Sequence, residues 1–254
     1  MKFVKALALV AATTLVAACG GGDTEDRLDL RDPVVRMLHA VPGGAPVSLF
    51  RQDVVQGDAT NVPYKDVTRY YDVSNNSATW SVRASSTSTV ALSSVDLNPE
   101  QGNRYTFVAL PGTAAGTLDL IAIDDPYDKG LTTDRARVRA LHAAPAAPAV
   151  DVYLIQPAQD LAVATPTYTA LGYKAAMPAS GDDSTEVPGG TFRLVLTGAG
   201  TKTIVFDAPV SIANNADWLL VAIPGPSGAA NDVRVLVAQG NDDQNGTTVE
   251  LVSQ

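Results

Sequence analysis

The sequence has few of the residues on which enzymes, metal proteins and disulfide-stabilised proteins depend. Its 254 residues include one cysteine, Cys19, and two histidines, His39 and His142. A single cysteine excludes an intramolecular disulfide, so each folded domain must be held by its own hydrophobic core. The sequence has no Gly-x-Ser-x-Gly segment, no His-Glu-x-x-His segment and no glycine-rich phosphate loop ending in Lys-Ser or Lys-Thr. These absences predict a protein that is not an enzyme and needs no cofactor.

Positive charge is also scarce. Lysine and arginine number 18 against 27 aspartates and glutamates, which gives a formal net charge of −9 at pH 7. If the first 18 residues are removed, Lys2 and Lys5 go with them and the net charge becomes −11. An excess of carboxylates repels phosphate backbones and anionic membrane surfaces, because both bind proteins through lysine and arginine. Nucleic acid is therefore excluded as a partner, and attachment to a membrane would need a lipid.

The apolar segment at the N-terminus, Ala6–Ala18, is too short to span a bilayer, which takes about 20 residues. It follows the positive charges of Lys2 and Lys5 and ends in Leu15-Val16-Ala17-Ala18-Cys19. This ending looks like the lipobox of bacterial lipoproteins, in which the cysteine is acylated and becomes the mature N-terminus. We therefore expect a signal peptide over residues 1–18 and a lipid, such as palmitate, on Cys19. An ordinary secretory peptide with an incidental cysteine is the alternative.

The residue after the cysteine bears on location. In the enterobacterial lipoproteins that this segment resembles, an aspartate at that position favours retention in the inner membrane, and this chain has Gly20 there. We therefore expect an outer-membrane lipoprotein of a Gram-negative bacterium, facing the periplasm or the cell surface. Residues 19–33 are too polar to bury and predict a flexible tether that holds the folded part away from the bilayer.

The two histidines mark an internal repeat. Arg36–Pro42 returns as Arg139–Pro145, with the histidines 103 residues apart. Two further pairs of landmarks follow in the same order: Tyr64-Lys65 with Tyr173-Lys174, and Phe107–Gly112 with Leu220–Gly225, the last pair at an offset of 113. Repeats of about 100 residues are whole domains rather than solenoid units. We expect domains over 34–124 and 136–238, a linker over 125–135, and a C-terminal hairpin or tail over 239–254.

Both domains have the pattern of short strands. Apolar and polar residues alternate in segments such as Trp80–Ala84 and Val138–His142, which place Arg83 and Arg139 on the outward face. Glycine, proline and asparagine mark turns between these segments at short spacing. The pattern predicts an all-β protein with two tandem immunoglobulin-like antiparallel β-sandwich domains.

The opening of the second copy resembles the signature of a known bacterial family. Residues 136–153 read Ala-Arg-Val-Arg-Ala-Leu-His-Ala-Ala-Pro-Ala-Ala-Pro-Ala-Val-Asp-Val-Tyr. They resemble the opening of the domain-of-unknown-function family DUF4397, and later landmarks extend the resemblance over most of residues 136–238. The first copy has Ser48 in place of the signature aspartate and Phe50 in place of the tyrosine. The resemblance implies envelope-anchored sandwich domains and brings no established activity, substrate or catalytic residue.

Each histidine stands where the inward face of a strand meets a loop that contains proline. A neutral imidazole in such a place is typically structural and bonds a loop carbonyl, and one histidine per domain cannot supply the three or four ligands of a zinc site. The candidate ligands for calcium, an ion that takes six to eight oxygens, are Asp124, Asp125 and Asp128 at the junction of the domains. The alternative is that these are solvated turn carboxylates, and the sequence predicts no resident metal.

Two classes of function remain. The first is a lipid-tethered, non-enzymatic module that binds an envelope protein or a glycan or supports the envelope structurally. The second is a hydrolase or other enzyme with an unrecognised site in the loops between the domains. The missing catalytic signatures favour the first class.

Overall fold

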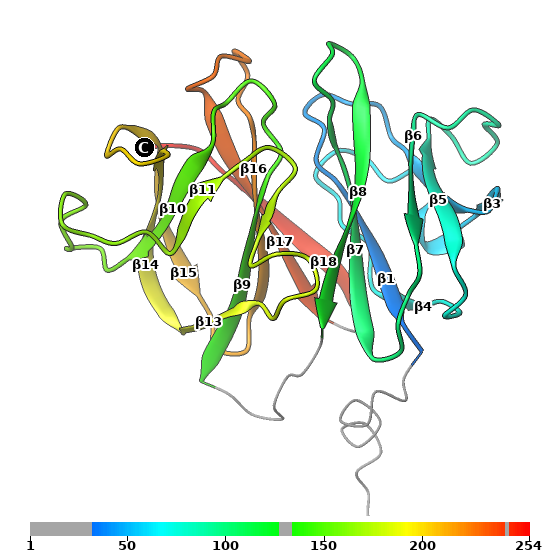
Figure 1. Cartoon of the computed structure of the whole chain (residues 1–254), viewed down its shortest axis with the longest axis horizontal. Coiled ribbons are helices and arrows are strands. Elements are labelled where there is room, and N and C mark those ends of the chain that lie inside the picture. The colour runs from blue at the N-terminus through cyan, green and yellow to red at the C-terminus, as the bar shows by residue number, and fades with distance from the viewer. Residues whose placement is uncertain (1–31, 127–133, 242–243) are drawn as a thin grey trace, which may run out of the picture.

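The computed structural model describes residues 32–126, 134–241 and 244–254. Apart from one 3₁₀ turn, η1 (Gly57–Ala59), the elements of these residues are strands. The strands form layered sheets, which confirms an all-β protein with sandwich domains (Figure 1). No helix within the described ranges is long and apolar enough to cross a membrane.

The first sandwich packs two four-stranded sheets over one core. The orders of the sheets are β4–β1–β7–β8 and β3–β2–β5–β6. The strands are β1 (Val34–His39), β2 (Ser48–Arg51), β3 (Val54–Val55), β4 (Tyr71–Asp72), β5 (Ala78–Arg83), β6 (Ser93–Leu97), β7 (Asn103–Pro111) and β8 (Leu118–Pro126). Alternate residues of each strand point inward. In the core between the sheets, the rings of Trp80 and Phe107 lie 4.6 Å apart, centroid to centroid.

The second sandwich repeats this plan. One sheet has the order β11–β10–β14–β15, and the other has the order β12–β9–β16–β17–β18 with β13 also paired to β9. The strands are β9 (Arg135–His142), β10 (Val150–Ile155), β11 (Tyr168–Leu171), β12 (Ala176–Met177), β13 (Thr185–Pro188), β14 (Gly190–Gly198), β15 (Ile204–Ile212), β16 (Asp217–Pro224), β17 (Val233–Asn241) and β18 (Gln244–Leu251). Phe192, Phe206 and Trp218 are buried in its core.

Each sandwich also contains one parallel pair of strands, which corrects the expectation of purely antiparallel sheets. The opening strand β1 runs parallel to β7, and its counterpart β9 runs parallel to β16. In the first copy the chain leaves β1 for the other sheet, pairs with one side of β1 at β4 and reaches its other side at β7. In the second copy β12 and β13 pair with β9 before β16 reaches its other side. A connection that crosses to the second sheet and back lets the two strands run in the same direction.

The boundaries between segments differ from those expected. Asp125 and Pro126 belong to β8, and Arg135 opens β9. The linker expected over 125–135 therefore includes residues at both ends that are paired in sheets, because Asp125 pairs with Arg104 and Arg135 pairs with Pro188. After the second domain, β18 pairs with β17 and extends that sheet within residues 239–254.

A third hydrophobic core joins the two sandwiches. The outer face of the sheet with β1 and β7 packs against the outer face of the sheet with β9 and β16 (Figure 1). Leu38 and Leu110 of the first copy and Leu141, Val221 and Leu236 of the second are fully buried there. The expectation that each domain is held by its own core alone is therefore incomplete, because the facing sheets bury apolar residues on both sides.

The arginines expected on the outward face are buried, which corrects the assignment of that face to solvent. Arg139 is 3% exposed, because Asp125 of the other copy and the loop after β12 of its own copy cover it. Its guanidinium donates to Asp125 Oδ1 at 2.9 Å and to the Pro178 carbonyl at 2.6 Å. Arg83 is 6% exposed and is covered within its own domain, where its guanidinium carbon lies 4.1 Å from the centroid of the Phe50 ring.

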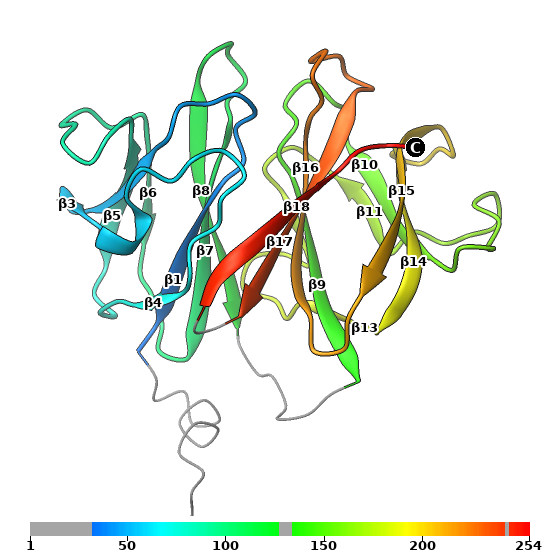
Figure 2. The same cartoon turned by 180° about the vertical axis from the view of Figure 1, so that it is seen from behind.

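The contact between the copies is approximately symmetric. Arg104 and Asp217 stand at the same place in the two copies, 113 residues apart, and form an ion pair with each other. Lys65 of the first copy pairs with Glu250 on β18, the strand that runs along the seam at the back of the molecule (Figure 2). Its counterpart Lys174 pairs with Asp119 on β8 at 2.7 Å. Lys65 and Lys174 also share the left-handed backbone conformation, with φ of 77° and 65°.

The residue at the position of the signature aspartate stabilises a loop in both copies. Asp151 accepts the N–H groups of Ala170 at 2.7 Å and Gly200 at 2.8 Å, and both of these residues have a positive φ. In the first copy, Ser48 Oγ accepts the N–H of Asn61 at 2.9 Å, and Asn61 also has a positive φ, of 52°. Serine therefore replaces one of the two bonds that the aspartate makes in the second copy.

Candidate functional site

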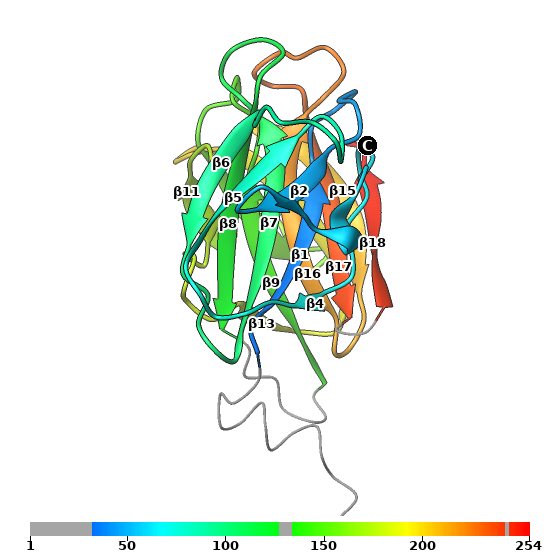
Figure 3. The same cartoon turned by 90° about the vertical axis from the view of Figure 1, so that its right-hand side faces the viewer.

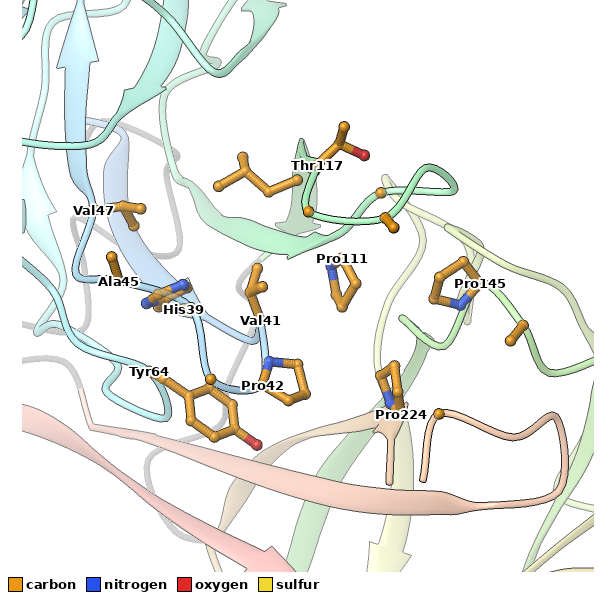
Figure 4. Close-up of a pocket in the computed structure, with 18 of the residues that line it drawn as sticks. His39, Val41, Pro42, Ala45, Val47, Tyr64, Pro111, Thr117, Pro145 and Pro224 are labelled. Carbon is orange, nitrogen blue, oxygen red and sulfur yellow. The ribbon is translucent and has the colours of Figure 1, made fainter. Parts of the chain in front are cut away.

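A cleft of about 1070 Å³ lies at the end of the molecule where the loops of both copies meet (Figure 4). The first copy contributes the loop between β1 and β2 and the turn between β7 and β8. The second copy contributes residues of the β9–β10 loop and the start of the β16–β17 loop. Neither copy forms the cleft alone, so its shape depends on the core that joins them.

Four prolines at repeated positions line this cleft. Pro42 and Pro145 are counterparts, as are Pro111 and Pro224, and all four are half-buried at its wall (Figure 4). Each ends a strand or follows one closely, where a residue without an N–H group stops the pairing of the sheet. Because proline has no N–H to donate, the wall that these rings form is apolar and poor in hydrogen-bond donors.

Charged groups gather at one side of the cleft. Glu250 accepts a hydrogen bond from Arg234 at 2.6 Å and forms an ion pair with Lys65. All three residues line the cleft. Burial opposes ionisation of Glu250, but the hydrogen bonds from Arg234 and Lys65 outweigh it and hold the pKa of the carboxyl below its usual range. Burial, followed by the charge of Glu250, raises the pKa of Tyr64 to about 12, so its phenol stays protonated.

His39 forms part of the wall and is fully buried. Its Nδ1 lies 3.1 Å from the Val62 carbonyl oxygen, so Nδ1–H is the donor and Nε2 carries the lone pair. Burial lowers the pKa of the imidazole, which stays neutral. Nε2 has no hydrogen-bond partner within the described part of the chain, and Gly44 covers it: a Cβ on Gly44 would lie 3.0 Å from Nε2.

His142 is also fully buried and does not line the cleft described here. Its Nε2 lies 3.0 Å from the Pro148 carbonyl oxygen, and its Nδ1 accepts the N–H of Ala144 at 3.2 Å. Both nitrogens therefore bond the loop that follows β9, in the manner expected of a structural histidine. His39 differs, because its carbonyl partner Val62 belongs to a later loop of the first copy.

The carboxylates considered for calcium do not converge. Asp124 and Asp125 are neighbours on β8, so their side chains point to opposite faces of the sheet. Asp125 is held by Arg104 and Arg139, whose charges outweigh burial and lower its pKa. Asp124 accepts a hydrogen bond from Asn103 at 3.0 Å, and burial raises its pKa to about 6. Asp128 and Cys19 lie outside the described residues.

Sequence reasoning did not find the cleft. In the sequence, Tyr64 and Lys65 stand out only as landmarks of the repeat. No pattern in the sequence indicates that Arg234 and Glu250 belong to a site. The prolines were visible at repeated positions, but only the packing of one copy against the other brings the four rings to the same cleft. Among the described residues, no group of three or more histidine, cysteine, aspartate or glutamate side chains is arranged to hold a metal ion.

Part of the chain matches a known protein family. Residues 33–153 match the family model described as "Domain of unknown function (DUF4397)". The match covers the first copy and the opening of the second, whereas the resemblance seen in the sequence was placed over residues 136–238. Residues 154–238 lie outside the matched range. No curated protein matches the chain.

Proposed function

Since residues 33–153 match the DUF4397 family model, which is described without an activity, we propose a function from the site itself. The protein is a lipid-anchored, non-enzymatic binding module of the cell envelope. It holds a ligand in the cleft that its two copies form together.

The anchor in this proposal is Cys19. Two lysines, the apolar segment Ala6–Ala18 and the small residues before the cysteine support lipidation at that position. Acyl chains such as palmitate contribute about 0.8 kcal/mol per buried methylene, and two chains hold a protein firmly. Gly20 after the cysteine supports an outer membrane in a Gram-negative envelope. The protein would face the periplasm or the cell surface.

The observation that carries the proposal is the position of the cleft. β1 begins at one end of the molecule, where the described chain starts, and the loops that line the cleft lie at the other end (Figure 3). A protein anchored through the residues that precede β1 is therefore attached at the end opposite the cleft, which leaves the cleft free to face the space beyond the bilayer. That orientation suits a module that meets a ligand in the space beyond the membrane.

The charged groups of the cleft support binding rather than catalysis. Glu250 is neutralised by Lys65 and Arg234, so it is a poor general base. One observation favours an enzyme: among the described residues, Nε2 of His39 has no hydrogen-bond partner, and its lone pair could act as a general base. A general base must reach the proton it abstracts, however, and Gly44 leaves no exposed surface on this ring.

Crosslinking in intact envelopes tests the proposal. A photoreactive amino acid at Ala146, an exposed cleft residue, should capture a specific ligand or partner, and one at Ala162, an exposed residue outside the cleft, should not. Equal products from both positions, or none from Ala146, would contradict a binding role for the cleft. Cys19→Ser tests the anchor separately: it should release the protein from the membrane fraction, and a variant that stays bound after a salt wash would refute lipidation.

A further inference from the structure

We infer that the cleft binds a free acyl-chain carboxylate, an elongated apolar molecule that ends in one negative charge. The inference rests on the proposed binding function and names the ligand class of the same site.

The wall of the cleft fits an apolar body. The four proline rings and Val41 present carbon surfaces, and the prolines offer no N–H group. A ligand rich in hydroxyl groups would lose its hydrogen bonds to water and regain few of them on the part of the wall that these five residues form. A flexible hydrocarbon chain loses none, and it gains stability from each part of its surface that leaves water. The volume of about 1070 Å³ leaves room for such a chain.

The charged side of the cleft fits a single anion. Of the charged residues that line the cleft, Lys65 and Arg234 are positive and Glu250 is negative, which leaves one excess positive charge there, although the whole chain has a formal net charge of −9. Asp232, beside the cleft, also interacts with Arg234. The side chain of Lys65 is 43% exposed and that of Arg234 is 29% exposed, whereas that of Glu250 is 9% exposed. A ligand therefore meets the two cations first. One ligand carboxylate, placed across from Glu250, pairs with Lys65, the more exposed of the two cations.

The position of the cleft favours a free molecule over a lipid in the anchoring bilayer. The loops that line the cleft lie at the end opposite the start of β1, so an anchor before β1 attaches the chain at the end away from the cleft (Figure 3). The acidic chain as a whole also repels an anionic lipid surface. Both points indicate that the ligand reaches the cleft from solution.

Calorimetric titration of the full chain with Cys19→Ser tests the ligand class, with dodecanoate and the uncharged dodecanol as probes below their aggregation concentrations. Dodecanoate should bind with a stoichiometry of one, and dodecanol should bind up to about fivefold more weakly, since a partly exposed charge pair contributes up to about 1 kcal/mol. Lys65→Gln should weaken dodecanoate about fivefold and leave dodecanol unchanged. Lys174→Gln is the matched control, because Lys174 is the counterpart of Lys65 with its own ion pair outside the cleft, and it should bind like the parent.

Two more experiments test whether the ligand binds in the cleft and whether it comes from solution or from a membrane. Ala146→Trp should abolish dodecanoate binding, whereas Ala162→Trp should not, and phosphatidylglycerol vesicles should not bind the protein. Equal affinities for dodecanol and dodecanoate, full binding by Ala146→Trp, or flotation with the vesicles would each overturn the assignment. If dodecanoate fails to bind while Ala146 still captures a partner in envelopes, the ligand class is wrong and the binding function stands. If both fail, the proposed function is wrong as well.

Discussion

Removal of the Arg104 guanidinium is expected to destabilise the whole chain, because this group joins the two copies. Its side chain is 4% exposed, and it donates to Asp125 Oδ2 at 2.9 Å and pairs with Asp217. Asp125 keeps a second bond from Arg139 at 2.9 Å. Among the described residues, Arg104 is the one ion-pair partner of the Asp217 carboxylate, which is 11% exposed. Arg104→Met therefore leaves a buried charge at Asp217 without compensation.

Breaking a buried ion pair in this way costs about 3–5 kcal/mol. At roughly 2–4 °C per kcal/mol for a chain of this size, the melting temperature should fall by about 6–20 °C. Asp217→Asn should cost less, since Arg104 retains Asp125, and Arg104→Met/Asp217→Asn should recover part of the loss. The assay is thermal unfolding of the three variants beside the parent, at low and at 0.5 M salt, where a buried pair is little screened. If Arg104→Met melts within about 1 °C of the parent, or if Asp217→Asn is the more damaging single change, the interface described here is wrong.

Three further predictions concern single residues. His142→Ala should cost about 1–3 kcal/mol, because it leaves buried loop groups unpaired, and His39→Ala should cost less, since its Nε2 has no partner to lose; equal melting temperatures for the two variants would contradict this. Asp151→Ala should destabilise more than Ser48→Ala in urea unfolding, since the aspartate accepts two N–H groups and the serine accepts one. The folded state raises the pKa of Asp124 to about 6, so the stability that its protonated form contributes is present below about pH 4 and is lost as pH rises through 6. Asp124→Asn should therefore raise the urea midpoint at pH 7.5 and leave it unchanged at pH 4, and the opposite pH dependence would refute the assignment.

Local patterns in the sequence were sufficient to predict the strands and the repeat. The alternation around Trp80 and Val138 reports which residues face the core of their own sandwich, and the histidines fix the register of the two copies. These features depend on neighbours in the chain or on a direct comparison of its halves. The sequence could therefore predict two all-β domains.

The contact between the copies could not be predicted in the same way. Arg139 has the alternation of a solvent-facing residue, because the pattern shows only that it points away from its own core. Whether another sheet covers that face depends on residues in the other copy, such as Asp125. The cleft depends on the same packing, since Pro42 and Pro224 line one wall only when the copies are fixed against each other.

Differential scanning calorimetry of the full chain tests most directly whether the two copies form one body with a shared cleft. A shared core that includes Leu38, Leu141 and Leu236 should make the copies unfold together. The account predicts a single transition whose calorimetric enthalpy equals its van't Hoff enthalpy, and a shift of that whole transition in Arg104→Met. Two resolved transitions, of which Arg104→Met moved only one, would show that the copies are independent and that no shared cleft exists.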